Sequence, residues 1–420
     1  MADKANGSAE TIAVIGAGIV GVSAAVWLAR DGHKVVLIDR LAPGEATSYG
    51  NAGVLASCSV VPVTVPGLIA KAPGMLLNGD SPLFLRWSYL PRLMPWLLRY
   101  LSHCRAEETE RIAAALTPII GDSLEQHQAL ARGTPAERWI APSDYVFAYR
   151  DRAAFESDAL TWRLRAENGF TWDLLEGNAL NDYEPGLGAE FRCGVRLSGH
   201  GHIKDPGRYV KDLATHLQSL GGEVRQAEVQ DFIVESEMLT GLETSTGRID
   251  CSRAVVAGGA WSGSLTGRLG LKVPLESERG YHVELREPSL MPRAPVMVTT
   301  GKFVVTPMDG RLRCAGIVEL GGLEAEPSRA PFALLLKQVK QAFPALTWSG
   351  VEEWMGHRPA PSDSIPLIGP LAGRPDVHMA FGHHHVGLTG GPKTGRIVAD
   401  LVAGRRPNFD LSPYRPERFS

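Results

Sequence analysis

The chain is poor in cysteine and has no long hydrophobic run. Its 420 residues include only Cys58, Cys104, Cys193, Cys251 and Cys314. These cysteines are widely separated and form no C-x-x-C pair, so they indicate neither a disulfide framework nor a zinc site, and a reducing cytoplasm is expected. The opening residues MADKANGSAE lack the apolar core of a secretory signal. Residues 46–70 carry no charged residue but are too rich in Gly, Pro, Ser and Thr for a membrane-spanning helix.

The chain also lacks a large excess of acidic or basic residues. The formal net charge is -3 at pH 7, and the basic residues form no stripe or cluster. A nucleic-acid partner is therefore not expected. A hydrophobic content of 44% over 420 residues can fill a large core, and this length suggests two domains or one elaborate domain.

A dinucleotide-binding βαβ unit is present at residues 11–40, TIAVIGAGIVGVSAAVWLARDGHKVVLIDR. A β-branched run enters a turn at Gly16, Gly18 and Gly21, and a second apolar run ends in Asp39. The first glycine makes the tight turn, the second lets backbone amides approach a pyrophosphate, and the third permits close helix packing. Asp39 can bind ribose hydroxyls, and the helix N-terminus favours phosphates. The unit predicts nucleotide binding without distinguishing NAD from FAD.

Later segments alternate between helical and strand patterns. A helical pattern covers residues 81–132, a helix is expected around residues 153–168, and Asp205-Pro206 marks the start of a helix that ends near Leu220. Residues 272–350 are mostly strand-like and include one helix near residues 332–342, which predicts an antiparallel sheet covering a ligand.

Four separated motifs carry a resemblance to a known family. They are GAGIVG at residues 16–21, AVVAGGAWS at 254–262, GHRPAPSDSIPLIG at 356–369 and FGHHHVGLTGGPKTG at 381–395. Together they resemble the D-amino-acid oxidase superfamily of FAD-dependent oxidoreductases, including its D-amino acid dehydrogenases and glycine or sarcosine oxidases. The resemblance implies noncovalent FAD and oxidation of an amine next to a carboxylate.

The resemblance also implies the fold class, which is α/β with an α+β substrate domain. A Rossmann-like FAD-binding domain is expected to interleave with a substrate domain built on an antiparallel sheet with helices. The expected FAD-binding parts are residues 1–78, 201–271 and 353–420, and the expected substrate-domain parts are residues 79–200 and 272–352.

By the same resemblance, the cofactor-binding positions follow the motifs. They are Gly16, Gly18, Ile19, Val20, Gly21, Asp39, Arg40, Ser48, Asn51, Ala52, Gly53, Val229, Gly258, Trp261, Gly387, Leu388 and Thr389. Pro392 suits the first turn of the last helix, whose N-terminus would then present free amides to the flavin N1 and C2 carbonyl.

Three residues are expected in the substrate site. The family places an arginine at Arg358 to grip the substrate carboxylate, and a planar guanidinium can pair with both carboxylate oxygens. Tyr281 could hold the same carboxylate or close the pocket, or it could simply pack in the core. His384 is expected to line the flavin, with a structural histidine as the alternative. No metal site is expected at His383 to His385, because consecutive side chains diverge.

Three functions compete on these grounds. The leading prediction is oxidative deamination of a D-amino acid, D-proline or a hydroxy-D-proline among them, by hydride transfer from Cα to flavin N5, with electrons passed to quinone or another acceptor. The alternatives are a glycine or sarcosine oxidase that uses O₂, and a non-catalytic flavin-binding regulatory protein. The aromatic and arginine-rich residues 83–101 suggest either peripheral contact with the cytoplasmic face of a membrane or an ordinary amphipathic element.

Overall fold

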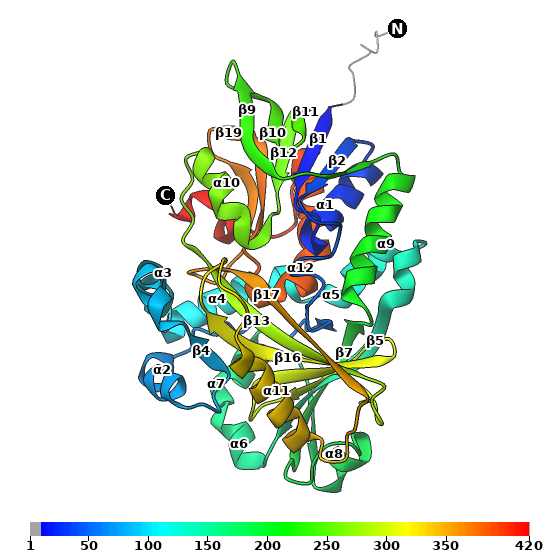
Figure 1. The fold of residues 1–420 in the computed structure, drawn as a ribbon, viewed down its shortest axis with the longest axis vertical. Helices are drawn as coiled ribbons and strands as arrows, with labels where there is room; N and C mark the ends of the chain where they lie inside the picture. Colours follow the sequence, from blue (N-terminus) through cyan, green and yellow to red (C-terminus); the bar gives the residue numbers. More distant parts are fainter. Residues whose placement is uncertain (1–9, 420) are drawn as a thin grey trace.

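Two β-sheets, each covered by helices, organise the molecule (Figure 1). The computed structural model describes residues 10–419, except for the side chains of Lys71 and Leu77. Most of the N-terminal stretch considered as a signal, residues 1–9, lies outside the described residues.

The first sheet contains the predicted βαβ unit. Its strand order is β18, β19, β12, β1, β2, β8, and every neighbouring pair is parallel except β18 with β19. The strands span Thr11–Ile15 (β1), Lys34–Asp39 (β2), Glu223–Gln226 (β8), Arg253–Val256 (β12), Leu367–Leu371 (β18) and Arg374–Phe381 (β19). Strands β1 and β12 are apolar almost throughout because helices or the neighbouring meander cover both faces of the sheet. That meander comprises Val229–Glu235 (β9), Met238–Thr244 (β10) and Gly247–Asp250 (β11).

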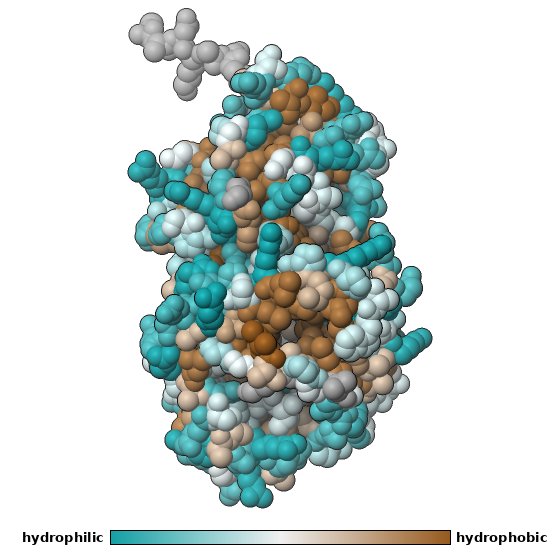
Figure 2. All heavy atoms as spheres, turned by 90° about the vertical axis from the view of Figure 1, so that its left-hand side faces the viewer, coloured by the Kyte–Doolittle hydropathy of each residue, from teal (hydrophilic) through white to brown (hydrophobic). Residues whose placement is uncertain are grey.

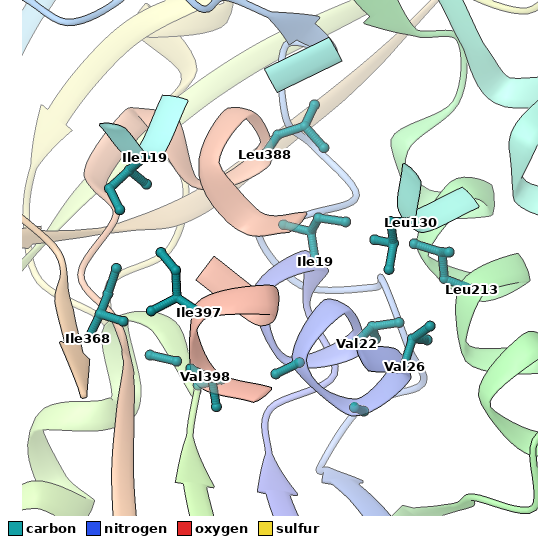
Figure 3. Close-up of a cluster of buried hydrophobic side chains, with 14 of the residues drawn as sticks. Ile19, Val22, Val26, Ile119, Leu130, Leu213, Ile368, Leu388, Ile397 and Val398 are labelled. Atoms are coloured by element: carbon teal, nitrogen blue, oxygen red, sulfur yellow. The ribbon is translucent and has the colours of Figure 1, made fainter. Parts of the chain in front are cut away.

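Three helices pack around one face of this sheet. They are Ile19–Arg30 (α1), Pro206–Ser219 (α9) and Gly387–Val402 (α12). Figure 3 shows α1 and α12 side by side, with Val22 and Val26 of α1 and Ile397 and Val398 of α12 in one apolar cluster. The approach is close, since a Cβ added at Gly395 would lie 2.5 Å from the Ala24 nitrogen.

The second sheet is larger and mostly antiparallel, as predicted. Its order is β17, β13, β16, β15, β14, β5, β7, β3, with β4 and β6 paired to β16 and β7. The strands span Val54–Leu55 (β3), Leu83–Leu85 (β4), Ile140–Tyr149 (β5), Asp173–Glu176 (β6), Cys193–Ile203 (β7), Leu275–Arg286 (β13), Val296–Val298 (β14), Phe303–Pro307 (β15), Arg311–Leu320 (β16) and Gly350–Pro361 (β17).

Helix Arg329–Ala342 (α11) covers one face of the second sheet, and its apolar side chains share a core with β13 and β16. The remaining helices are Leu68–Leu77 (α2), Leu90–Ser102 (α3), Ala106–Ile120 (α4), Ser123–Ala131 (α5), Arg152–Ser157 (α6), Ala159–Glu167 (α7), Asn178–Tyr183 (α8) and Ser262–Arg268 (α10). The helix expected around residues 153–168 is in fact α6 and α7, which meet at Asp158. The helix start at Asp205 is confirmed, because its Oδ1 accepts from the Arg208 amide at 2.9 Å.

The chain passes between the two sheets several times. Strands of the first sheet come from residues 11–39, 223–256 and 367–381, and strands of the second sheet come from the intervening segments. This arrangement is the interleaving that the sequence analysis expected. The domain boundaries at residues 78, 200, 271 and 352 stay predictions.

Candidate active site

One cavity of about 480 Å³ runs between the two sheets. Its size is in the range of pockets that bind small molecules and cofactors. All three predicted substrate-site residues border it, and so do all the predicted cofactor positions except Gly21 and Gly53. The structure therefore brings together segments that lie more than 370 residues apart in the chain, from Gly16 to Thr389.

The first βα turn forms one end of this cavity. Asp39 is fixed here by two backbone amides, since Oδ2 accepts from Ala17 at 2.7 Å and Oδ1 accepts from Leu41 at 2.9 Å. Each carboxylate oxygen keeps a second lone pair, which a ribose hydroxyl can use. Ser48 accepts from the Ile19 amide at 2.9 Å and so binds the N-terminus of α1 from outside the helix.

Two glycines of this turn, Gly16 and Gly21, are required by different contacts. Gly16 has φ +109°, and a Cβ there would overlap the Ala257 carbonyl. A Cβ at Gly21 would overlap the Gly16 carbonyl oxygen, so Gly21 permits the helix to start close to the strand without touching the cavity. These contacts match the roles of the first and third glycines in a dinucleotide turn.

Arg40 and Trp261 border the same end of the cavity. The Arg40 guanidinium lies 4.0 Å from the centroid of the Trp261 ring, a cation–π contact. Val229 and Gly258 border the cavity beside them. This wall offers one flat, positively charged surface to a nucleotide.

The loop before β3 is held by the predicted positions Asn51 and Gly53 and by Arg313 and Glu284, which the sequence analysis missed. Asn51 Oδ1 accepts from the Gly53 amide at 2.8 Å, and Gly53 has φ +80°. Arg313, which is fully buried, donates to the carbonyls of Tyr49 at 2.8 Å and of Asn51 at 2.5 Å. Its charge is balanced by Glu284 at 2.5 Å. An arginine within the apolar strand RLRCAGIV was the only signal for this role.

The last helix starts earlier than predicted. Helix α12 begins at Gly387, so Pro392 lies inside it rather than at its first turn. The glycines allow close packing, since a Cβ at Gly390 would lie 2.8 Å from the Ile119 Cγ2 atom. The amides of Gly387, Leu388 and Thr389 occupy the first turn, which has no intrahelical acceptors, and these three residues border the cavity.

Pro392 leaves one carbonyl of α12 without its usual donor. Proline has no N–H to donate to the carbonyl four residues earlier, that of Leu388. His127 Nε2 lies 2.9 Å from this oxygen, and its Nδ1 lies 2.9 Å from the Tyr209 hydroxyl. His127 is fully buried, and burial lowers its pKa to about 4.

Acid should therefore weaken the fold through His127. Its folded pKa lies below the ordinary value of 6.5, so the unfolded chain takes up a proton first as pH falls, and stability is lost between about pH 6.5 and pH 4. One such histidine contributes at most about 1.4 kcal/mol per pH unit in this window. In H127Q, the unfolding free energy from urea titrations at pH 7 and pH 5 should fall less than in the unmodified protein. Equal losses would contradict the assignment.

The end of the cavity where the sequence analysis expects the substrate lies on the two adjacent strands β13 and β17. Glu278 pairs directly with Arg358, Gly280 with Gly356 and His282 with Trp354, so these side chains share one face. A Cβ at Gly280 would collide with the Arg358 guanidinium, which lies flat over that backbone. Within residues 10–419, Arg358 makes no side-chain hydrogen bond and no ion pair shorter than 4 Å. Its burial lowers its pKa, with Glu278 opposing.

The Tyr281 hydroxyl does not make the contact that the sequence analysis expected. The residue borders the cavity, but its hydroxyl donates to Glu319 at 2.6 Å and accepts from the Ser328 amide at 3.0 Å. Its ring packs against Phe332 of α11. The period-two alternation of β13 turns the Tyr281 ring to the α11 face and His282 to the opposite face, which also carries Glu278 and Gly280. The packing alternative therefore applies, and the hydroxyl is unavailable to a substrate carboxylate.

His384 borders the cavity in a strained conformation, with φ +51°. Its Nε2 lies 2.6 Å from Glu278 Oε2, and both side chains are buried. Burial would raise the pKa of Glu278, but His384, then Arg358, outweigh it and hold that pKa below its usual value. Glu278 was missed from sequence. Its only signal was a carboxylate within a strand buried on both faces.

The amphipathic segment at residues 83–101 is partly internal. Strand β4, a 3₁₀ turn at Trp87–Tyr89 and α3 form it. Trp96 donates from Nε1 to the Ala360 carbonyl at 2.9 Å and stacks on Tyr100. In the described part of the chain, no helix has the length and apolar character needed to span a bilayer.

The cavity fits FAD by its own residues. The glycine turn leaves room for a pyrophosphate, Asp39 offers acceptors at the end of β2, and the first-turn amides of α12 meet the cavity at its other end. No trio of His, Cys, Asp or Glu in residues 10–419 is placed to bind a metal.

Comparison with known proteins agrees with this geometry. The family described as FAD dependent oxidoreductase matches residues 11–401. A D-amino-acid oxidase of Bradyrhizobium diazoefficiens is 40% identical over 415 residues, covering 97% of this chain and 98% of the relative. A D-amino acid dehydrogenase of Paramagnetospirillum magneticum is 30% identical over 433 residues, covering 97% of this chain and 99% of the relative.

Solved structures share the fold. Glycine oxidase from Geobacillus kaustophilus superposes with a TM-score of 0.74 at 22% identity, covering 97% of this chain and 98% of that chain. L-proline dehydrogenase from P. horikoshii superposes with a TM-score of 0.75 at 19% identity, covering 98% of each chain.

Proposed function

Because the chain belongs to the family of FAD-dependent oxidoreductases, we propose that it oxidatively deaminates D-amino acids. The observation that carries the proposal is Arg358, a partly buried guanidinium that borders the cavity and has no ion-pair partner within the described residues. A carboxylate can replace the water that this group lost on burial, with two parallel hydrogen bonds. The two relatives named for D-amino acids support the substrate class.

The chain's own residues orient the substrate in this scheme. Arg358 binds the carboxylate, and Trp354, which stacks on His282, forms the neighbouring wall. Bound FAD would supply the acceptor for the hydride of Cα. Water would then hydrolyse an acyclic imino acid to a 2-oxo acid and ammonia, whereas a cyclic imino acid would keep its nitrogen. Positioning of this kind supplies a large part of the rate enhancement.

Anaerobic titration of the purified holoenzyme tests the proposal. D-amino acids, D-proline and hydroxy-D-proline among them, should bleach the flavin absorbance near 450 nm, whereas their L-enantiomers should not. Bleaching by glycine or sarcosine alone would favour the alternative of a glycine or sarcosine oxidase. An absence of bleaching by every amine would favour a flavin-binding regulatory protein.

We also propose that electrons leave to a quinone or another acceptor, with O₂ as the alternative. An apolar, hollowed patch lies on the face that carries α2 and α3 (Figure 2). Exposed apolar side chains on these elements include Ile69, Met94 and Leu98, and Trp87 stands 61% exposed beside them. Such a surface suits an apolar acceptor or a membrane surface. Anaerobic turnover with a soluble quinone, compared with turnover in air, separates the acceptors.

A further inference from the structure

A carboxylate and an imidazole share the substrate end of the cavity without an evident structural need. Glu278 and His384 are both more than nine-tenths buried and come from separate elements, β13 and the 3₁₀ turn His384–Val386. Their closest atoms, Oε2 and Nε2, are 2.6 Å apart. Within the described residues neither imidazole nitrogen has a hydrogen-bond partner of good geometry, so Nε2 has only its close contact with the Glu278 carboxylate, and Nδ1 is buried without any partner. A buried polar atom left without a partner is costly and calls for a ligand.

The charged surroundings favour a proton acceptor here. Arg358 faces the pair from β17, His385 from the same turn and Tyr100 from α3, and Glu276 lies two residues away on β13. Burial lowers the pKa of His385 to about 3, so it stays neutral. Burial, and then Glu278, raise the pKa of Tyr100 well above its usual value, so it stays neutral too. Glu278 is thus the nearby anion that can stabilise a protonated His384.

The proposed substrate needs such an acceptor. A D-amino acid enters with an ammonium group, and a nitrogen without a lone pair cannot assist departure of the Cα hydride. We infer that Glu278 and His384 together accept the proton of the substrate ammonium group, an inference that rests on the proposed function. The N–H bond breaks, its electron pair stays on nitrogen, and the proton passes to Nδ1 of His384. Glu278 accepts a hydrogen bond from Nε2–H and stabilises the imidazolium, as a carboxylate does in a catalytic triad. The proton later returns to solvent.

A ligand that cannot react tests where the proton resides. The probe is 2-aminoisobutyrate, which has a carboxylate and an ammonium group but no Cα hydrogen. Isobutyrate, which lacks the amine, is the matched comparator. In holoenzyme labelled with ¹⁵N-histidine, the His384 signals, assigned by their loss in H384N, should become doubly protonated with 2-aminoisobutyrate and stay singly protonated with isobutyrate. His384 that stays singly protonated with both ligands, or that is doubly protonated before ligand is added, would overturn the inference.

Kinetics provide a second measurement that does not need the inert ligand. Flavin reduction by a D-amino acid in single turnover should be nearly independent of pH between 7 and 9 in the unmodified enzyme. In H384N and E278Q the rate constant should rise by up to about tenfold per pH unit, because solvent must then take the proton.

E276Q is the matched control for E278Q. Glu276 lies on the same strand and is bound by Tyr89 and by the Ser277 amide, and it does not border the cavity. It should therefore keep the flat profile. A flat profile in H384N would overturn the inference while leaving the proposed function intact. Failure of every D-amino acid to reduce the unmodified enzyme would instead count against the proposed function.

Discussion

Replacing Arg358 with Ala is expected to lower kcat/KM for D-amino acids by roughly 10²–10³-fold, corresponding to about 3–4 kcal/mol for the loss of one partner of a partly buried ionic contact. R358K keeps the charge but loses the planar pair of donors, so a smaller loss of roughly 10–100-fold is expected. Steady-state kinetics and the affinity for carboxylate inhibitors measure both effects. The affinity should fall with the rate, because the guanidinium binds the carboxylate before any chemistry occurs.

Arg329 offers a matched control for Arg358. It lies at the start of α11, its side chain is 89% exposed, and it pairs with Glu353 away from the cavity. R329A should leave kcat/KM and inhibitor affinity within about twofold of the unmodified protein, because exposed ion pairs contribute little. If R358A behaved like R329A, Arg358 would not be the carboxylate-binding residue.

The second large effect is expected from Gly21→Ala. The added methyl group would overlap the Gly16 carbonyl oxygen. The Gly16 carbonyl and the Gly21 backbone that carries the methyl group are both held in place by other contacts. The helix would therefore have to move away from the glycine turn. The cost should reach or exceed the upper end of about 1–3 kcal/mol for overpacking. The variant should purify without yellow colour and should not recover flavin absorbance on incubation with FAD.

Gly267→Ala separates this effect from the general consequences of replacing a helical glycine. Gly267 lies in α10, and a Cβ there would have nothing within 4 Å. G267A should retain FAD and gain about 0.5–1 kcal/mol of stability, because alanine loses less backbone entropy on folding. A G21A protein with normal flavin content would contradict the packing argument for Gly21.

Local chemistry made most of the nucleotide end predictable. The turn at Gly16 and Gly18, the carboxylate of Asp39 and the helix that follows are close in sequence, and their spacing is fixed by backbone geometry. The C-terminal helix was harder to delimit. Pro392 favours a helix start by its own conformation, yet the helix begins five residues earlier, because tertiary contacts from His127 satisfy the carbonyl that proline leaves free.

The sequence by itself determined the family, the cofactor class and the glycine-dependent cradle, since these depend on residues within one turn or one motif. Only the tertiary structure decided which side chains of β13 face the cavity. Period-two alternation gives two faces but does not say which one meets the cavity, and pairing with β17 and packing of α11 made that choice. As a result Tyr281 belongs to the core, and Glu278, brought beside Arg358 and His384 from positions 80 and 106 residues apart in the chain, belongs to the site.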